Sequence, residues 1–333
     1  MSLLEVDRLS VSYRVDAGLF QNRDLHAVSD VSFGVGRGES VGLVGESGCG
    51  KSSLAKALMR MIPVREGQCT FDGQDVLSLK GAALKQYRRQ VQMIFQDPYG
   101  SLNERMTVGD AIGEVLMVHD IVPKAERRTR VAELLTAVGL DSDYMNRYPH
   151  EFSGGQRQRI GIARALAQDP SLIIADEPVS ALDVSVQVQI LNLMKDLQQE
   201  RGLSYLFVAH DLAVVRYVCD RILVMYLGEI VEEGTVDELF DDPRHPYTQA
   251  LISAVPDVGK GLANRGQAGG RIVLQGDVPS PMDRPSGCVF HPRCRYATDQ
   301  CRQEVPPPLS VEGKHRARCH FAVQGLPEVE LTS

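Results

Sequence analysis

Residues 45–52 read Gly-Glu-Ser-Gly-Cys-Gly-Lys-Ser, and this stretch decides the fold class of the chain. It lies between an apolar run, Ser40–Val44, and a helical pattern over Lys51–Met61. The eight residues fit a phosphate-binding loop, whose glycines let backbone N–H groups face one anion while the following helix adds its positive dipole end. Lys51 would pair with the β- and γ-phosphates of a nucleotide, and Ser52 would ligate Mg²⁺. The alternative is a chance glycine-rich turn before a helix.

Four further apolar runs have the length and composition of buried strands. They are Val91–Phe95, Leu172–Ala175, Tyr205–Ala209 and Ile222–Met225. Helical patterns over Gln156–Ala167 and Val186–Arg201 separate several of them. Strands that alternate with helices predict an α/β fold with a mainly parallel sheet. Because such sheets bind ligands beyond the carboxyl ends of their strands, functional residues are expected directly after these runs.

An acidic pair follows the run Leu172–Ala175. Asp176 would hold Mg²⁺, mostly through water, and Glu177 would orient or deprotonate the attacking water. Alone, such a pair is often a solvated turn, and the upstream phosphate loop is what favours the catalytic interpretation.

A second candidate anion site precedes the helix Gln156–Ala167. Ser153, Gly154, Gly155 and Gln156 form an S-x-x-Q capping box, which is sufficient as a structural explanation. The two glycines, however, expose bare backbone N–H groups at a helix N-terminus. Two anion sites with one phosphate loop predict a symmetric dimer, in which each nucleotide lies between the loop of one subunit and the Ser-Gly-Gly helix of the other.

In this order, the phosphate loop, the Ser-Gly-Gly-Gln signature and Asp176-Glu177 resemble the nucleotide-binding subunits of ABC transporters. The resemblance implies a P-loop cassette with a RecA-like core and a helical subdomain, here about residues 97–155, that rotates when ATP binds. Gln96 matches the family's Q-loop, Asp183 its D-loop at the dimer seam, and His210 its H-loop. Phe152 and Ala209 replace the Leu and Ser of many members.

The resemblance assigns catalytic roles to Glu177, His210 and Gln96. Gln96 also joins Ser52 and Asp176 as a Mg²⁺ ligand, and Tyr13 stands where the family stacks an aromatic ring on adenine. The residues expected to bind the nucleotide are Tyr13, Gly45, Ser47, Gly48, Cys49, Gly50, Lys51, Ser52 and Ser53.

Three phrases resemble more narrowly the second ATPase subunit of dipeptide/oligopeptide importers. They are Tyr148–Ser153, Ala175–Val184 and Pro243–Leu251. The resemblance implies a related ATPase subunit as heterodimer partner, two transmembrane permease subunits and an extracytoplasmic substrate-binding protein. It also implies a position at the cytoplasmic face of the membrane. Importers of nickel complexes or glutathione, and a soluble ABC ATPase outside transport, are the alternatives.

The chain's 333 residues, 36 basic and 43 acidic, carry a net charge of −7. A net acidic chain is a poor candidate for nonspecific nucleic-acid binding. Its apolar runs, such as Ile222–Leu227, are far shorter than the ~18 residues of a membrane helix. The N-terminus lacks the pattern of a signal peptide. We therefore expect a cytosolic protein that meets a membrane only through partners.

Composition shifts near residue 256, where a Pro- and Cys-rich tail (256–333) follows a cassette of residues 1–255. Four cysteines lie in this tail, Cys288, Cys294, Cys301 and Cys319. A reducing cytosol argues against disulfides, and their spacing lacks the tight pairs of structural zinc sites. Six basic residues against three acidic ones between 288 and 320 favour thiolates. A [4Fe–4S] cluster, which some relatives of this importer group carry, is expected here; zinc or plain buried thiols are the alternatives.

Overall fold

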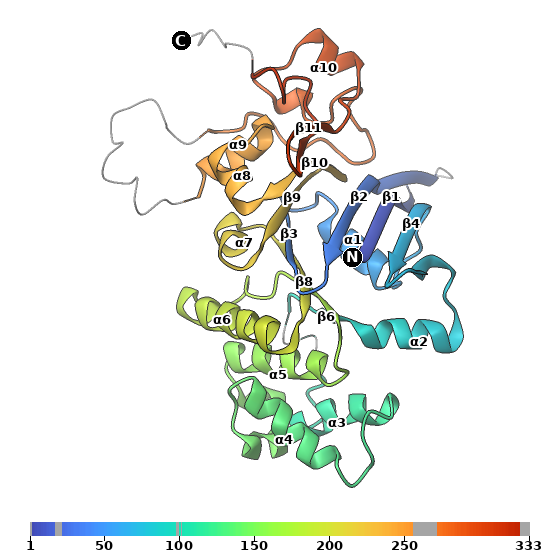
Figure 1. Ribbon diagram of the computed structural model, residues 1–333, viewed down its shortest axis with the longest axis vertical. Coiled ribbons are helices and arrows are strands. Elements are labelled where there is room, and N and C mark those ends of the chain that lie inside the picture. Colours follow the sequence, from blue (N-terminus) through green and yellow to red (C-terminus); the bar gives the residue numbers. More distant parts are fainter. Residues whose placement is uncertain (1, 17–21, 98–99, 101, 256–271, 327–333) are drawn as a thin grey trace.

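A computed structural model describes residues 2–16, 22–97, 100, 102–255 and 272–326, and it contains two sheets. The larger has eight strands in the order β11-β12-β10-β9-β3-β8-β7-β6, and the smaller has four in the order β2-β1-β4-β5. The helical segment with α3 and α4 lies at one end of the long axis, and the tail with α10 lies at the other (Figure 1).

Five neighbouring parallel strands, from β9 to the edge strand β6, make up one side of the larger sheet. They are β3 (Ser40–Val44), β6 (Val91–Ile94), β7 (Leu172–Asp176), β8 (Ser204–Ala209) and β9 (Arg221–Tyr226). All five correspond to the predicted apolar runs, and every residue of β3, β7 and β8 is buried. The predicted α/β class with a mainly parallel core is therefore confirmed.

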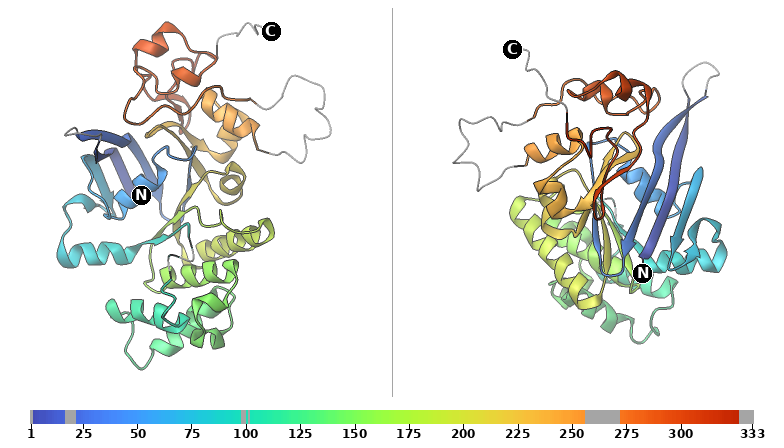
Figure 2. Two further views of the ribbon diagram at one scale, coloured as in Figure 1. Left: turned by 180° about the vertical axis from the view of Figure 1, so that it is seen from behind. Right: turned by 45° about the horizontal axis from the view of Figure 1, so that its top comes forward.

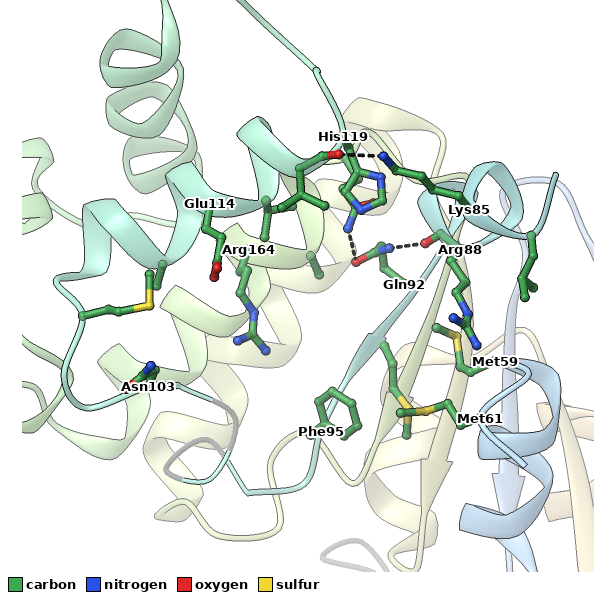
Figure 3. A pocket seen from close by; sticks show the side chains of 18 of the residues that line it. Met59, Met61, Lys85, Arg88, Gln92, Phe95, Asn103, Glu114, His119 and Arg164 are labelled. Atoms are coloured by element: carbon green, nitrogen blue, oxygen red, sulfur yellow. Dashed lines mark hydrogen bonds between the residues drawn. The ribbon is translucent and has the colours of Figure 1, made fainter. Parts of the chain in front are cut away.

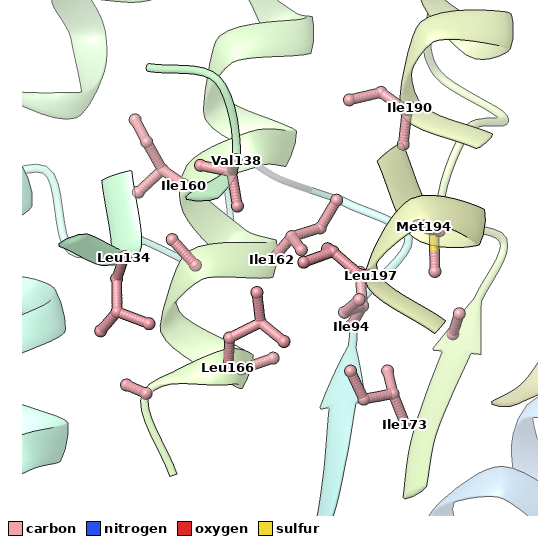
Figure 4. Close-up of a cluster of buried hydrophobic side chains, with 14 of the residues drawn as sticks. Ile94, Leu134, Val138, Ile160, Ile162, Leu166, Ile173, Ile190, Met194 and Leu197 are labelled. Atoms are coloured by element: carbon pink, nitrogen blue, oxygen red, sulfur yellow. The ribbon is translucent and has the colours of Figure 1, made fainter. Parts of the chain in front are cut away.

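Helices cover the two faces of this sheet differently. On one face, α1 (Lys51–Leu58) packs into a cluster with Leu43, Ile174 and Leu206. On the other face, α5 (Gly154–Leu166) and α6 (Val184–Arg201) pack against Ile173 and Phe207. Figure 4 shows Ile162 of α5 facing Leu197 of α6 and the strand residues Ile94 and Ile173, with Ile160 on the opposite side of α5.

The smaller sheet, which the sequence did not predict, stands on the α1 side of the parallel sheet (Figure 2). Its long strands β1 (Ser2–Asp16) and β2 (Asn22–Gly36) are antiparallel, and β4 (Glu66–Phe71) and β5 (Gln74–Asp75) extend it. The short 3-10 helix η1 (Val76–Ser78) and α2 (Gly81–Gln90) lead from it to β6.

The helical segment lies between β6 and β7 in the sequence. It contains α3 (Val108–Val118), α4 (Arg127–Ala137), η2 (Ser142–Asn146) and η3 (Pro149–Glu151), and α5 follows. A single apolar cluster joins Ile112, Leu134 and Leu166 of this segment to Ile173 of the sheet. These helices lie within the stretch where a helical subdomain is expected, although the boundaries 97 and 155 stay a prediction.

The tail is joined to the larger sheet. In chain order, α7 (Leu212–Val218) precedes β9. After β9 come β10 (Glu229–Thr235), α8 (Val236–Asp241) and α9 (Pro246–Ser253). The tail then adds η4 (His291–Arg293), α10 (Asp299–Gln303), β11 (Leu309–Glu312) and β12 (His315–Ala317), and β12 pairs with β10. Residues on both sides of the expected boundary at 255/256 thus share one sheet.

Candidate nucleotide site

The phosphate loop connects the end of β3 to the start of α1, as the sequence predicts. Glycine is required at two of its positions. A Cβ on Gly45 would lie 2.1 Å from the Met225 carbonyl oxygen, and a Cβ on Gly50, whose φ is +108°, would lie 2.1 Å from the Ala27 carbonyl oxygen. Close backbone approach therefore fixes the shape of the loop.

Lys51 begins α1 and is buried. Its Nζ donates to the Gly45 carbonyl oxygen at 2.7 Å and to the Glu46 carbonyl oxygen at 3.0 Å. The ammonium group is thus held by carbonyl oxygens of the loop itself. When a nucleotide binds, it would exchange these acceptors for phosphate oxygens.

Two of the three residues expected to hold Mg²⁺ come together, Ser52 from the first turn of α1 and Asp176 from the end of β7. The Ser52 hydroxyl donates to Asp176 Oδ1 at 3.1 Å. Burial raises the pKa of Asp176, the hydrogen bond from Ser52 lowers it, and neighbouring Glu177 raises it. A buried carboxylate beside a hydroxyl supplies the hard oxygen donors that Mg²⁺ prefers, and few protein ligands are needed when phosphates complete its shell. The donor set therefore fits the ion.

Glu177 is the centre of the three residues predicted to be catalytic. Its Oε2 accepts a hydrogen bond from Gln96 Nε2 at 2.9 Å and lies 3.2 Å from His210 Nδ1. Its φ of +47° puts a non-glycine residue in the left-handed region, where strain is commonly stored at functional sites. Two residues far apart in the sequence, Gln96 and His210, therefore converge on one carboxylate oxygen of Glu177.

The signature residues form the predicted capping box. The Ser153 hydroxyl accepts from the Gln156 N–H at 3.3 Å, and Gln156 Oε1 accepts from the Ser153 N–H at 3.0 Å. A Cβ on Gly155 would lie 2.4 Å from Val186 Cγ1, whereas one on Gly154 would come only within 3.3 Å of Leu182. Gly155 is thus required for the packing of α5 on α6, a reason that the sequence did not reveal.

Tyr13 and Asp183 lie at other places around the site. Tyr13 is partly buried, and its hydroxyl donates to Ser53 Oγ at 3.1 Å, which ties β1 to α1. Asp183 is exposed at the N-cap of α6 and makes no side-chain capping bond there.

Three residues to which the sequence analysis assigned no role fix the phosphate loop. Glu46 lies within the loop, and Tyr247 and Arg293 bond to it from α9 and the tail. No local pattern pointed to them, because the partners are about 200 or more residues apart in the sequence.

The structure does not support the metal site that was expected at the four tail cysteines. Burial first, and then the neighbouring thiols of Cys294, Cys301 and Cys319, raise the pKa of Cys288 to about 12. Burial likewise raises the pKa of Cys294 and of Cys319 to about 11. These thiols are therefore close enough to interact, and burial disfavours the thiolates that the sequence predicted for Cys288, Cys294 and Cys319. In the described part of the chain, no group of three or more His, Cys, Asp or Glu residues is arranged to hold a metal ion, so the structure does not support a cluster.

Comparison with known proteins decides the family. Residues 28–180 match the family model described as ABC transporter, and residues 231–301 match that of the oligopeptide/dipeptide transporter C-terminal region. The oligopeptide transport ATP-binding protein AppF of Bacillus subtilis is 49% identical over 96% of this chain and 97% of its own length. This chain belongs to the oligopeptide-transporter family of ABC ATPases. The oligopeptide transport ATP-binding protein OppF of Haemophilus influenzae is 48% identical over 95% of this chain and 96% of its own.

Solved cassettes share the fold of this ABC ATPase. A dimeric ATP-binding cassette, MJ0796, in a post-hydrolysis state with ADP and Pi is 29% identical, with a TM-score of 0.62 over 70% of this chain and 98% of that one. Clostridium perfringens cbiO1, part of a cbiONQ transporter complex, is 27% identical, with a TM-score of 0.63 over 72% of this chain and 91% of its own. The family membership makes the chain an ATP hydrolase, as the sequence predicted.

Within the described residues, no helix combines the length and the apolarity needed to cross a bilayer.

We expect Gly155→Ala to cost about 1–3 kcal/mol of unfolding free energy, because the new methyl group overpacks against Val186. Gly154→Ala is the matched control and should cost much less. The double variant Gly155→Ala/Val186→Ala should recover most of the loss in chemical denaturation. Equal losses for the two glycines, or no recovery, would contradict this account of the α5–α6 contact.

Proposed function

We propose that this ABC ATPase powers the import of di- or oligopeptides across the cytoplasmic membrane. The observation that carries the proposal is the match of both segments, cassette and C-terminal region, to the oligopeptide transporter family along nearly the whole chain. Relatives named as peptide transport ATP-binding proteins support the same substrate class over nickel complexes or glutathione. Membership in a transporter family argues against a soluble ABC ATPase acting outside transport.

In the proposed reaction, Lys51 and the loop N–H groups hold the β- and γ-phosphates, and Ser52 and Asp176 hold Mg²⁺ with Gln96. When bound, Mg²⁺ neutralises charge that develops on the phosphates. Glu177 orients the attacking water and accepts its proton, and His210 hydrogen-bonds the γ-phosphate and steadies Glu177. The convergence of Gln96 and His210 on Glu177 Oε2 supports these roles. Tyr13 would exchange its Ser53 contact for the adenine ring.

Hydrolysis would require two cassettes. The phosphate loop leads into α1 on one face of the sheet, whereas the signature Ser153–Gln156 begins α5, which packs on the other face. This separation supports a dimer in which the signature closes the partner's nucleotide site, with Asp183 at the seam. A cassette relative solved as a dimer is consistent with this arrangement.

A groove beside Gln96 is a suitable contact for a permease subunit. It has a volume of about 790 Å³ and lies where α2, β6 and α3 meet (Figure 3). Phe95, Met61 and Val118 give it apolar walls, and Lys85 and Arg88 add positive charge along α2. A short helix of a membrane partner seated here would touch β6 and Phe95, which directly precedes Gln96, and so be coupled to the nucleotide.

The finer arrangement also belongs to the proposal. A related ATPase subunit completes the dimer, two transmembrane permeases bind the pair at the cytoplasmic face of the membrane, and an extracytoplasmic binding protein delivers substrate to the permeases. The similarity to OppF, named as an oligopeptide transport ATP-binding protein, supports the role of an ATPase subunit in such an assembly.

Replacement of Glu177 by Gln should lower ATP hydrolysis by about 10²–10⁴-fold, because the amide cannot accept a proton from water. ATP binding should persist, and closed dimers should accumulate in gel filtration with ATP. In a strain that lacks the endogenous gene, wild-type protein should restore peptide uptake and Glu177→Gln should not. Full ATPase activity in the variant would remove Glu177 from its role, and restored nickel or glutathione uptake without peptide uptake would overturn the substrate class.

Ser153→Arg should damage the nucleotide site of the partner, not its own. Dimers that combine one Lys51→Met copy with one Ser153→Arg copy retain one intact site if the signature acts in trans. Dimers that carry both changes in the same copy, beside a wild-type copy, retain none. Half of wild-type hydrolysis in the first dimer and none in the second is the expected result, and the reverse pattern would rule out closure by the partner.

The [4Fe–4S] prediction for Cys288, Cys294, Cys301 and Cys319 is tested by colour. Protein purified without oxygen should absorb near ~400 nm if the four cysteines bind a cluster, and a Cys301→Ser variant should lose that band. Colourless protein with one zinc per chain would show that the four cysteines bind zinc and not an iron–sulfur cluster. Colourless protein without metal would leave four buried thiols.

A further inference from the structure

Glu46 is an acidic residue inside a loop built to bind anions. Its main chain is held at both ends, because its N–H donates to Tyr247 Oη at 2.8 Å and its carbonyl accepts from Lys51 Nζ at 3.0 Å. Its carboxylate accepts two hydrogen bonds from Arg293, Nη1 to Oε2 at 2.6 Å and Nη2 to Oε1 at 3.2 Å. The loop residue next to Gly45 is thus fixed by two side chains from outside the loop.

Arg293 belongs to the tail, 247 residues beyond Glu46. Its side chain is only 7% exposed, and its guanidinium lies 5.9 Å from the ring centroid of Tyr226 on β9. Phe290, one turn earlier, packs edge-on against Tyr226, with ring centroids 5.2 Å apart, and at a tilt against Tyr247, with centroids 5.5 Å apart. An aromatic cluster shared by β9, α9 and the tail therefore sets the position of the guanidinium.

The geometry is that of a strong charge pair. A two-point guanidinium–carboxylate bond fixes orientation as well as charge, and a lysine could not reproduce it. Without that partner, the Glu46 carboxylate would stand beside the backbone N–H groups and the Lys51 ammonium that the triphosphate needs. It would repel the phosphates and compete for the same donors.

We propose that Arg293 is a positioning residue of the nucleotide site, which neutralises Glu46 and holds its carboxylate toward the tail, so that the C-terminal segment sets the ATP affinity of its own cassette. Tyr247 assists by fixing the Glu46 N–H. The tail would then act on ATP binding in cis, separately from any substrate that the transporter carries.

The test is the ATP dissociation constant of full-length Arg293→Met, measured by calorimetry in the presence of Mg²⁺. We expect it to rise by about tenfold, with KM for hydrolysis rising in parallel and kcat within about twofold of wild type. Arg318→Met is the matched control, because Arg318 also joins the tail to the cassette, through Asp30 and Glu229, without reaching the loop.

Two further variants separate the loss of the charge pair from a general loss of folding stability. Glu46→Gln/Arg293→Met removes both charges and should bind ATP within about threefold of wild type, whereas Arg293→Lys should recover only part of the affinity. Melting temperatures without nucleotide should be alike for Arg293→Met and Arg318→Met.

Three outcomes would overturn the proposal. They are an unchanged dissociation constant for Arg293→Met, an equal loss for Arg318→Met, or no recovery in the double variant. Wild-type protein that fails to bind ATP would instead overturn the assignment of the cassette, so the two failures are distinguishable.

Discussion

The register of the parallel sheet is the constraint on which the nucleotide site depends. Val44, the last residue of β3, pairs with Ala209, which directly precedes His210. Asp176, the last residue of β7, pairs with Val208, whose carbonyl also accepts the Glu177 N–H at 2.8 Å. Because a slip of one residue turns every side chain to the other face, only this register brings phosphate loop, acidic pair and histidine to one edge.

The same sheet separates the two anion-binding helices. Alternate residues of β7 face opposite clusters, so Ile174 packs with α1 and Ile173 with α5. The loop before α1 and the signature before α5 are therefore attached to different layers of the molecule. In the proposed dimer, movement of the helical segment relative to the sheet would shift the signature while leaving the loop fixed.

Local patterns made much of this site predictable. The strand ends and the phosphate loop are set by short-range features: an apolar run, a glycine pattern and a capping box each occupy fewer than ten residues. The antiparallel sheet could not be predicted in the same way, since β1 carries register shifts against β2 at several points, which break the alternation of buried and exposed residues. The short strand β12, of three residues, has too few positions to show any period.

Contacts between distant segments were the least predictable, and the tail illustrates why. Glu232 on β10 is buried and accepts hydrogen bonds from the Arg244 and His245 N–H groups, and His315 Nε2 lies 2.8 Å from its Oε1. A buried carboxylate is tolerated only when its partners are all present, and here they come from the turn before α9 and from β12. The physical unit that folds therefore includes both. Since α9 also carries Tyr247, whose hydroxyl accepts the Glu46 N–H, hydrogen bonds connect the tail through Glu232 and α9 to the phosphate loop.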